Sequence, residues 1–236
     1  MKKIYFLPVI ATQWFIRLIT GAVFLFFCNL KGKGLSNLDK YKRPLIFASN
    51  HASEWDGPLI RTVMPMISRF APMFYVSMAR EYYVNSGWRK NIYGGTFFKT
   101  VGAYPVYYGL KDFKKSLKNH IRIIGDGGCV NIFPEGRCSK TGDTANFKPG
   151  VIALSHITDT PIVPVYIKDT GNLTRKEFFS HKRHVTIIFG TPYKPEINNK
   201  LSGEQLLTEY KEKAVELRDK VLELLEEKQS SNGSTR

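Results

Sequence analysis

The stretch from residue 129 to residue 168, CVNIFPEGRCSKTGDTANFKPGVIALSHITDTPIVPVYIK, decides the fold. It begins with a short apolar run, Cys129–Phe133, passes through a polar loop into the apolar segment Gly150–Ile157, and ends in the proline-bounded run Pro161–Lys168. The two outer runs have the length and composition of buried strands, and the middle segment has those of a helix. Strands that alternate with helices in this way imply an α/β sheet that is at least partly parallel.

The sequence on both sides continues this alternation of strands and helices. Further apolar runs predict strands at Pro44–Asn50, Phe74–Met78, Gly102–Tyr108 and His184–Gly190, and helices are predicted at 57–67 and Asp112–Gly125. Pro105 cannot donate a ladder hydrogen bond, so its strand is expected at an edge or a bulge. The sequence therefore predicts an α/β fold with a central mixed, partly parallel sheet flanked by helices.

Length and composition limit the class of protein. The chain has 236 residues, 43% hydrophobic and 23% charged, which fits one folded domain with or without an appendage. Its three cysteines form no CxxC or Cys/His cluster, so neither a disulfide framework nor structural zinc is expected, and a reducing cytosol fits best. The net charge of 35 − 20 = +15 points to nucleic acid, an anionic membrane or an anionic small molecule as partner.

The N-terminal segment favours the membrane among these partners. Residues 4–30 read IYFLPVIATQWFIRLITGAVFLFFCNL, with Arg17 as the only charge. One helix of this length would measure roughly 40 Å, against roughly 30 Å for a bilayer core. Arginine near the middle of a span costs about 2.5–3.5 kcal/mol, which weakens the case for a simple crossing. No small-residue cleavage site follows the apolar run, which argues against a signal peptide.

The flanks of this segment indicate its orientation. Basic residues stand on both sides, and the downstream side has more of them: Lys2 and Lys3, then Lys31, Lys33, Lys40, Lys42 and Arg43. The heavier downstream flank predicts that the folded body lies on the cytoplasmic side. Two basic flanks also suit a helix or bent hairpin that dips into the bilayer without crossing it. A core helix of the domain is the remaining alternative.

A candidate base follows the first predicted strand of the body. His51 begins the run His-Ala-Ser-Glu-Trp-Asp that ends at Asp56. The carboxyl ends of strands are where α/β sheets place ligands, and a carboxylate five residues on can fix the imidazole tautomer and leave the other nitrogen free as a base. Because no G-x-S-x-G elbow occurs, the imidazole would act directly on a substrate hydroxyl or on water. Taken alone, the spacing also fits an incidental histidine beside a helix-capping aspartate.

A second cluster is predicted at the same edge of the sheet. The strand at 129–133 runs into Pro134-Glu135-Gly136-Arg137, and arginine binds phosphate oxygens in a bidentate fashion. Lys148-Pro149-Gly150 then opens a helix, whose N-terminus favours anions. An anionic substrate beside His51 is therefore expected. No metal is expected, because the pair His181 and His184 has no third ligand nearby.

Four motifs in order resemble the glycerolipid acyltransferase family, typified by bacterial 1-acylglycerol-3-phosphate acyltransferases. They are NHASEWD at 50–56, GAYPVYY at 102–108, FPEGRCS at 133–139 and TPIVPV at 160–165, within a resemblance that covers about residues 40–195. The resemblance implies that His51 is the general base on the acceptor hydroxyl and that Asp56 orients it. It also implies that Glu135 and Gly136 shape the acceptor site.

Two positions depart from the family pattern. Tyr108 stands where the second motif usually has an arginine for the acceptor phosphate, and Cys138 stands where the third motif often has a basic residue. The phosphate contacts are therefore expected to differ, with Arg137 standing in. Cys138 is expected to be a spectator, since no activating group is visible near it in the sequence.

The resemblance implies an O-acyltransferase that moves a fatty acyl group from a thioester to the hydroxyl of a lyso-phospholipid. The leading acceptor is 1-acylglycerol-3-phosphate, which would become phosphatidic acid, and the donor would be acyl-coenzyme A or acyl carrier protein. No metal, no other cofactor and no covalent acyl-enzyme are implied. Another lyso-lipid or a non-phosphate acceptor is the alternative within this class. A basic nucleic-acid-binding protein is the alternative from another class, disfavoured because no recognised binding motif occurs.

The expected organisation has four parts. Residues 1–30 form a membrane-associated helix, 31–200 the acyltransferase catalytic domain, 201–228 a C-terminal amphipathic helix docked on the domain, and 229–236 a disordered tail. The expected location is the cytoplasmic face of an anionic membrane, which is the inner membrane if the source is bacterial.

Overall fold

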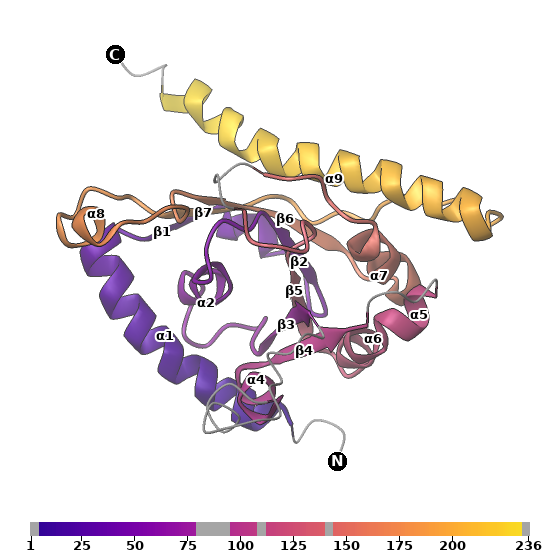
Figure 1. Cartoon of the computed structure of the whole chain (residues 1–236), viewed down its shortest axis with the longest axis horizontal. Coiled ribbons are helices and arrows are strands. Elements are labelled where there is room, and N and C mark those ends of the chain that lie inside the picture. Colours follow the sequence, from indigo (N-terminus) through magenta and orange to yellow (C-terminus); the bar gives the residue numbers. More distant parts are fainter. Residues whose placement is uncertain (1–4, 79–94, 108–111, 140–143, 233–236) are drawn as a thin grey trace.

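A computed structural model describes residues 5–78, 95–107, 112–139 and 144–232 of the chain. In this part of the chain, seven strands form one sheet in the order β1-β7-β6-β2-β5-β3-β4 (Figure 1). The strands are β1 Lys31–Lys33, β2 Ile46–Ser49, β3 Met73–Met78, β4 Ala103–Val106, β5 Cys129–Ile132, β6 Ile162–Lys168 and β7 Thr186–Phe189. Only β6 and β7 pair antiparallel, so the predicted mixed, partly parallel sheet is confirmed.

Helices cover both faces of this sheet. They are α1 Phe6–Cys28, α2 Asp56–Thr62, α4 Gly95–Val101, α5 Phe113–Ser116, α6 Lys118–Gly125, α7 Gly150–Thr158, α8 Arg175–Phe179 and α9 Gly203–Asn232, with a short 3-10 turn at Leu35–Leu38. Side chains alternate between the two faces of the sheet along β2 and the residue before it. Ile46 and Ala48 join the core under α6, α7 and α9. Leu45 and Phe47 join the core under α2.

The strand, helix and strand predicted within residues 129–168 are present as β5, α7 and β6. Both strands pair in parallel with β2, which lies between them, so the carboxyl ends of these three strands meet at one edge of the sheet. The strand that contains Pro105 is β4, and it lies at the outer edge of the sheet as its proline predicts.

Two predicted helices differ from those in the structure. The helix predicted at Asp112–Gly125 is divided into α5 and α6 at Leu117, whose backbone leaves the helical region. The apolar spacing continues across this break, so the pattern gave no sign of it. The helix predicted at 57–67 ends at Thr62, and the guanidinium of buried Arg61 donates to the carbonyls of Pro65 and Met66 in the turn that follows.

The N-terminal apolar segment forms α1, a single helix that turns its polar residues toward the body. Pro8 lies in its first turn, where the missing N–H has no helical partner to lose. Gln13 accepts from the backbone N–H of Met73 at 3.1 Å, and Arg17 donates through Nη2 to the carbonyl of Met64 at 2.8 Å. Thr20 shares a hydroxyl hydrogen bond of 2.7 Å with Thr62. These contacts fasten α1 along its length.

The opposite side of α1 is a continuous apolar surface. Among the described residues, α1 is the one helix long and apolar enough to cross a membrane, and 28% of its most apolar window is buried. Its large exposed side chains, here called the α1 stripe, are all hydrophobic and between 43% and 67% exposed: Leu7, Trp14, Phe15, Leu18, Ile19, Leu25 and Phe26. The core-helix alternative therefore fits one side of α1, and the other side is apolar and exposed.

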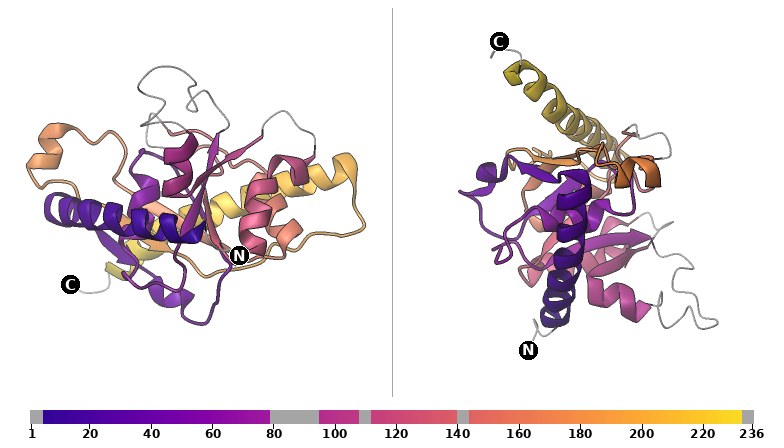
Figure 2. Two further views of the ribbon diagram at one scale, coloured as in Figure 1. Left: turned by 90° about the horizontal axis from the view of Figure 1, so that it is seen from below. Right: turned by 90° about the vertical axis from the view of Figure 1, so that its left-hand side faces the viewer.

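The C-terminal helix α9 lies on the other side of the molecule from α1 (Figures 1 and 2). It packs on β6, β7 and α7 through buried side chains spaced by four, three and four residues: Tyr210, Ala214, Leu217 and Val221. The helix continues to Asn232, so the first four residues of the tail predicted at 229–236 are helical instead of disordered. Residues 233–236 lie outside the described part of the chain.

Candidate functional site

His51 and Asp56 form a hydrogen-bonded pair at the carboxyl end of β2. Asp56 opens α2 with its side chain fully buried, and its Oδ2 lies 3.0 Å from His51 Nδ1. The same oxygen accepts from the backbone N–H groups of Ala52 and Ser53 at 2.7 and 2.8 Å. Because this oxygen is an acceptor, His51 Nδ1 donates to it, and Nε2 of the neutral ring keeps its lone pair. The turn-capping role and the histidine-orienting role of Asp56 thus coexist.

The His51 ring is also held from its face. It stacks on the ring of Phe133, the residue that follows β5, with centroids 4.0 Å apart and planes 17° apart. The His51 side chain is 19% exposed, so part of the ring remains accessible to a substrate. Stacking and the Asp56 hydrogen bond together fix both the plane and the rotation of the imidazole, which a positioned general base requires.

Glu135 fastens the loop that carries His51 to the loop after β5. Its buried carboxylate accepts from the backbone N–H of His51 at 2.8 Å and from that of Ala145 at 3.2 Å. Burial raises the pKa of Glu135, and the hydrogen bonds from His51 and Ala145 oppose that rise. The backbone N–H of Ser139 donates to the carbonyl of His51 at 2.7 Å. Both backbone groups of His51 are therefore bound to the Pro-Glu-Gly loop, and Glu135 acts on His51 by holding its backbone.

Gly136 allows a lysine to lie across the turn. Its φ of +69° is one that side-chain-bearing residues rarely adopt, and a Cβ there would stand 2.6 Å from Lys148 Nζ. The backbone N–H of Lys148 donates to the carbonyl of Pro134 at 2.8 Å, which fixes the lysine beside the turn. The sequence pattern indicates Lys148 only as the start of a helix and does not predict its place beside this turn. The glycine at position 136 was the available signal, because a turn glycine can leave room for a neighbouring side chain.

The remaining predicted site residues differ in how well the structure defines them. Arg137 is exposed in the same turn as Gly136, and within the described residues no hydrogen bond or ion pair fixes its guanidinium. Tyr108 lies outside the described residues. Cys138 is exposed, and partial burial followed by the charges of Asp56, Glu54 and Glu135 raises the pKa of its thiol. These causes disfavour the thiolate, which fits the spectator role expected for Cys138.

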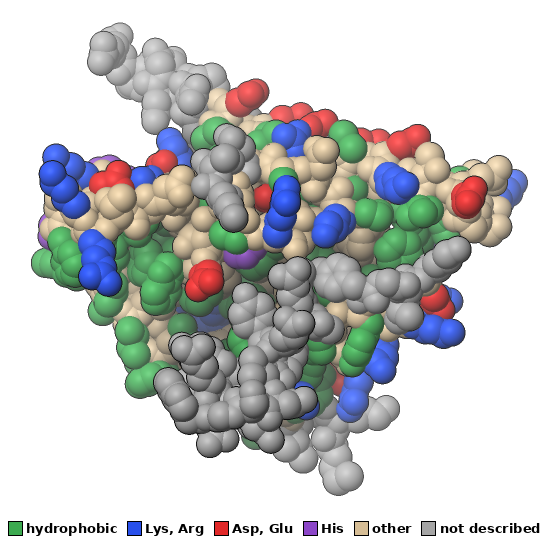
Figure 3. Space-filling model, viewed as in Figure 1, with side chains coloured by type: hydrophobic (Ala, Val, Ile, Leu, Met, Phe, Trp, Pro, Cys, Tyr) green, Lys and Arg blue, Asp and Glu red, His purple; other side chains and the backbone are tan. Residues whose placement is uncertain are grey.

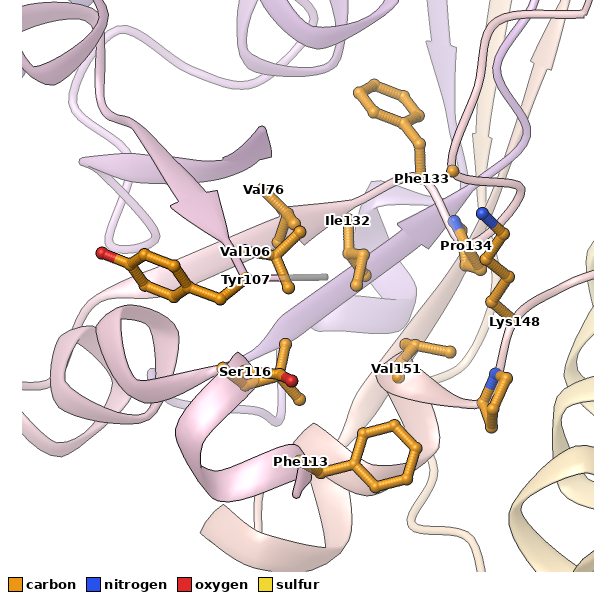
Figure 4. Close-up of a pocket in the computed structure, with 14 residues that line it drawn as sticks. Val76, Val106, Tyr107, Phe113, Ser116, Ile132, Phe133, Pro134, Lys148 and Val151 are labelled. Atoms are coloured by element: carbon orange, nitrogen blue, oxygen red, sulfur yellow. The ribbon is translucent and has the colours of Figure 1, made fainter. Parts of the chain in front are cut away.

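An apolar cavity of about 240 Å³ opens beside the turn (Figure 4). Its walls come from β3, β4, α5, β5 and α7, with Val76, Val106, Phe113, Ile132 and Val151 among the apolar side chains. The cavity is also lined by Gly136, Lys148 and Phe133, and Phe133 is the residue whose ring stacks on His51. In Figure 4, Lys148 and Phe133 lie toward one end of the cavity and Phe113 lies toward the other. The site thus joins an imidazole base to a space suited to an apolar group.

This combination of groups limits the chemistry that the site offers. Across the described ranges, no group of three or more His, Cys, Asp or Glu side chains is arranged to hold a metal ion. Among the described residues, Arg137 and Lys148 carry positive charge at the turn, and α7 begins two residues after Lys148. The arrangement can remove a proton from a bound group, hold an anion beside it and enclose an apolar chain.

Comparisons with known proteins point to one family. The family model described as Acyltransferase matches residues 29–168. The chain is 25% identical over 163 residues to the chloroplastic 1-acyl-sn-glycerol-3-phosphate acyltransferase BAT2 of Brassica napus. The matched region covers 68% of this chain and 44% of that protein. It is 25% identical over 169 residues to the chloroplastic enzyme LPAT1 of Arabidopsis thaliana, with 70% and 44% covered. The chain therefore spans less than half the length of these two relatives.

One bacterial relative and one solved structure add to this. The 1-acyl-sn-glycerol-3-phosphate acyltransferase of Borreliella burgdorferi is 40% identical over 52 residues, 22% of this chain and 21% of that protein. The fold is similar to the crystal structure of PlsC, the 1-acyl-sn-glycerophosphate (LPA) acyltransferase of Thermotoga maritima. The TM-score is 0.58 at 22% sequence identity, covering 92% of this chain and 80% of that one. At this identity the likeness concerns the fold.

Proposed function

The chain belongs to the acyltransferase family, whose model matches more than half of it, and from this premise we propose that it esterifies the hydroxyl of a lyso-phospholipid with a fatty acyl group from a thioester. The leading acceptor is 1-acylglycerol-3-phosphate, and the product would be phosphatidic acid. The observation that carries the proposal is the His51–Asp56 pair, whose partly exposed imidazole stacks on Phe133, one of the residues that line the apolar cavity. The relatives named 1-acyl-sn-glycerol-3-phosphate acyltransferase support this choice of acceptor.

In the proposed reaction, His51 is the general base. Its Nε2 takes the proton of the acceptor hydroxyl while the hydroxyl oxygen forms a bond to the thioester carbonyl carbon. The carbon–sulfur bond then breaks, and the departing sulfur takes the proton from the imidazolium. Asp56 stabilises the imidazolium through its 3.0 Å contact with Nδ1 and keeps the ring in the reactive tautomer. Phe133 and the backbone bonds of His51 limit the motion of the ring during both steps.

The cavity and the basic residues would hold the substrates. An acyl chain fits the apolar walls between β4, α5 and α7, and transfer of each buried CH₂ from water contributes about 0.8 kcal/mol. Arg137 and Lys148 offer two positive charges to an acceptor phosphate, beside the N-terminus of α7. The proposed acyl donor is acyl-coenzyme A or acyl carrier protein. The proposed reaction uses no metal, no other cofactor and no covalent acyl-enzyme.

We also propose that α1 lies in the surface of a membrane, with the body on the cytoplasmic side. The α1 stripe supplies an apolar surface, and the residues that would be costly in lipid are bound to the body. Arg17 in particular donates to the carbonyl of Met64, so its charge need not enter the hydrocarbon. A helix held in this way suits an interfacial position better than a crossing. Anionic lipids would match the net charge of +15.

The test uses purified full-length protein, labelled acyl-coenzyme A or acyl carrier protein, and a set of acceptors. We expect transfer to 1-acylglycerol-3-phosphate and a much lower rate with a monoacylglycerol. Arg137→Ala should lower kcat/KM by roughly ten- to a hundred-fold with the phosphate acceptor, because a charge-assisted hydrogen bond contributes roughly 1.5–3 kcal/mol. It should leave the monoacylglycerol rate unchanged.

The same assay separates the alternatives. Equal slowing by Arg137→Ala with both acceptors would show that Arg137 is structural and would favour a non-phosphate acceptor. Transfer to a different lyso-lipid alone would replace the acceptor and keep the mechanism. Salt-sensitive DNA binding in a mobility-shift assay, with no transfer to any acceptor, would favour the nucleic-acid-binding alternative.

A further inference from the structure

A short excursion between β6 and β7 stands at the C-terminal end of α1. It spans residues 169–185 and contains α8, which Figure 1 shows beside the end of α1. The ring of Phe178 stacks on that of Phe27 with centroids 4.8 Å apart, and Phe179 lies edge-on to Phe27 at 5.4 Å. His181 Nδ1 donates to the carbonyl of Phe26 at 2.9 Å. The excursion is therefore fixed to α1 by several contacts.

The apolar surface of α1 continues onto this excursion. Phe179 is 63% exposed, and its ring adjoins the end of α1 where Leu25 and Phe26 are exposed to similar extents. Nothing in the catalytic proposal uses Phe179. Aromatic side chains exposed in one contiguous patch are typical of surfaces that bind a membrane or another molecule. Figure 3 shows hydrophobic side chains gathered at this end of the molecule, directly beside Lys and Arg side chains.

The charges of the excursion distinguish it from the stripe. Residues 169–185 contain four basic side chains and two acidic ones, a net charge of 4 − 2 = +2. Glu177 is already bound to Arg183, with Oε1 and Nη2 3.1 Å apart, and the bonds from Arg183 and Thr174 lower the pKa of Glu177 to about 2. The basic side chains that remain are exposed: Arg175, Lys176 and Lys182.

We infer that the excursion is a second membrane contact, in which Phe179 enters the interfacial layer and Arg175, Lys176 and Lys182 bind the headgroups of anionic lipids. Aromatic residues beside basic ones form the usual anchor at a membrane surface, and an anionic bilayer complements their charge. The inference rests on the proposed placement of α1 in the bilayer, with which the patch is continuous. With α1 and the excursion both in contact with the membrane, the orientation of the body relative to the lipid surface would also be fixed.

The first experiment measures binding to vesicles by flotation across a range of lipid concentrations. Arg175→Gln/Lys176→Gln is compared with Lys200→Gln/Lys211→Gln, which removes the same charge from exposed positions near and on α9. On vesicles containing phosphatidylglycerol, we expect the variant with both α8 charges removed to bind about 30-fold more weakly. Each basic residue near an anionic surface contributes about 1 kcal/mol to binding, and two residues are lost. The control pair should change binding less than threefold, and neither pair should change binding to phosphatidylcholine. Equal losses for the two pairs, or no loss for the α8 pair, would overturn the inference.

The second experiment tests the aromatic part. Phe179→Ser should weaken binding to both kinds of vesicle by about tenfold, because the lost contribution is apolar. Val215→Ser, at an exposed position on α9, is the matched control and should change nothing. Phe15→Ser/Leu18→Ser tests α1 separately. If that variant keeps full binding, the placement of α1 fails. If it loses binding while the Phe179 and α8 charge variants bind normally, only the inference about α8 fails.

Discussion

The edge of the sheet around His51 and the helix α1 arrange polar groups in opposite ways. At the sheet edge, buried Asp56 and Glu135 hold an imidazole that is partly exposed to a substrate. In α1, Gln13, Arg17 and Thr20 point into the body and leave hydrophobic side chains outside. Polar contacts therefore position a reactive group in the first region, and they orient an apolar surface in the second. The comparison predicts that substitutions in the first region change turnover and that substitutions on the stripe change membrane binding.

The largest expected effect concerns His51. His51→Ala should lower kcat by roughly 10²- to 10⁴-fold, the range that general base catalysis usually contributes. Membrane binding and far-UV circular dichroism should stay normal, because the ring lies at the margin of the fold. His156→Ala, which removes a histidine bonded to Tyr210 and Asn199 on the α9 side, is the control and should keep its turnover. Near-normal turnover of folded His51→Ala protein would end the proposed mechanism.

The next effect concerns the α1 stripe. Phe15→Ser/Leu18→Ser should weaken partition into vesicles by roughly a hundredfold, since burying each large apolar side chain contributes about 1.5–3 kcal/mol. Turnover on substrate dispersed in detergent should stay within threefold, since neither residue contacts the site. Flotation and a detergent assay on the same preparation measure both. A comparable loss of turnover in detergent would show that the two regions are not separable.

The smallest expected effect concerns Glu135. The Glu135 carboxylate accepts one hydrogen bond from the backbone N–H of His51 and one from that of Ala145. In Glu135→Gln, an NH₂ group replaces one of the two oxygens, so one of these N–H groups faces a donor instead of an acceptor. We expect kcat to fall about tenfold with little change in KM, because loosening His51 costs roughly one charge-assisted hydrogen bond. Glu54→Gln removes an exposed carboxylate nearby and should be silent. A rise in KM alone would instead place Glu135 in contact with the acceptor.

Much of the fold was predictable because its strands are short apolar runs between breakers. The β5–α7–β6 unit and the edge position of β4 follow directly from such runs and from Pro105. The three-residue strand β1 was missed because Lys31-Gly32-Lys33 has no strand composition. The break at Leu117 was missed because the helical spacing of apolar residues continues through it. The inward side of α1 was readable in principle, since Gln13, Arg17 and Thr20 are spaced by four and three residues.

The site divides in the same way. The spacing of His51 and Asp56 is local, so the sequence could predict that they meet. The bond between the His51 backbone and Glu135 joins residues 84 apart in the chain, and no local pattern records it. The stacking of His51 on Phe133 likewise depends on β2 and β5 being neighbours in the sheet. Sequence thus predicted the reacting pair, and the structure added the contacts that hold it.

The central claim is that His51 and Asp56 act as one unit, and a double-variant cycle tests it most directly. Single-turnover rates are measured for the wild type, His51→Ala, Asp56→Asn and the double variant, on 1-acylglycerol-3-phosphate with the same acyl donor. Asp56→Asn should itself lose about a hundredfold or more, because an amide facing Nδ1 favours the wrong tautomer. If Asp56 acts only through His51, the double variant will be as slow as His51→Ala alone. Losses that multiply in the double variant would contradict the claim, because Asp56 would then contribute without the imidazole.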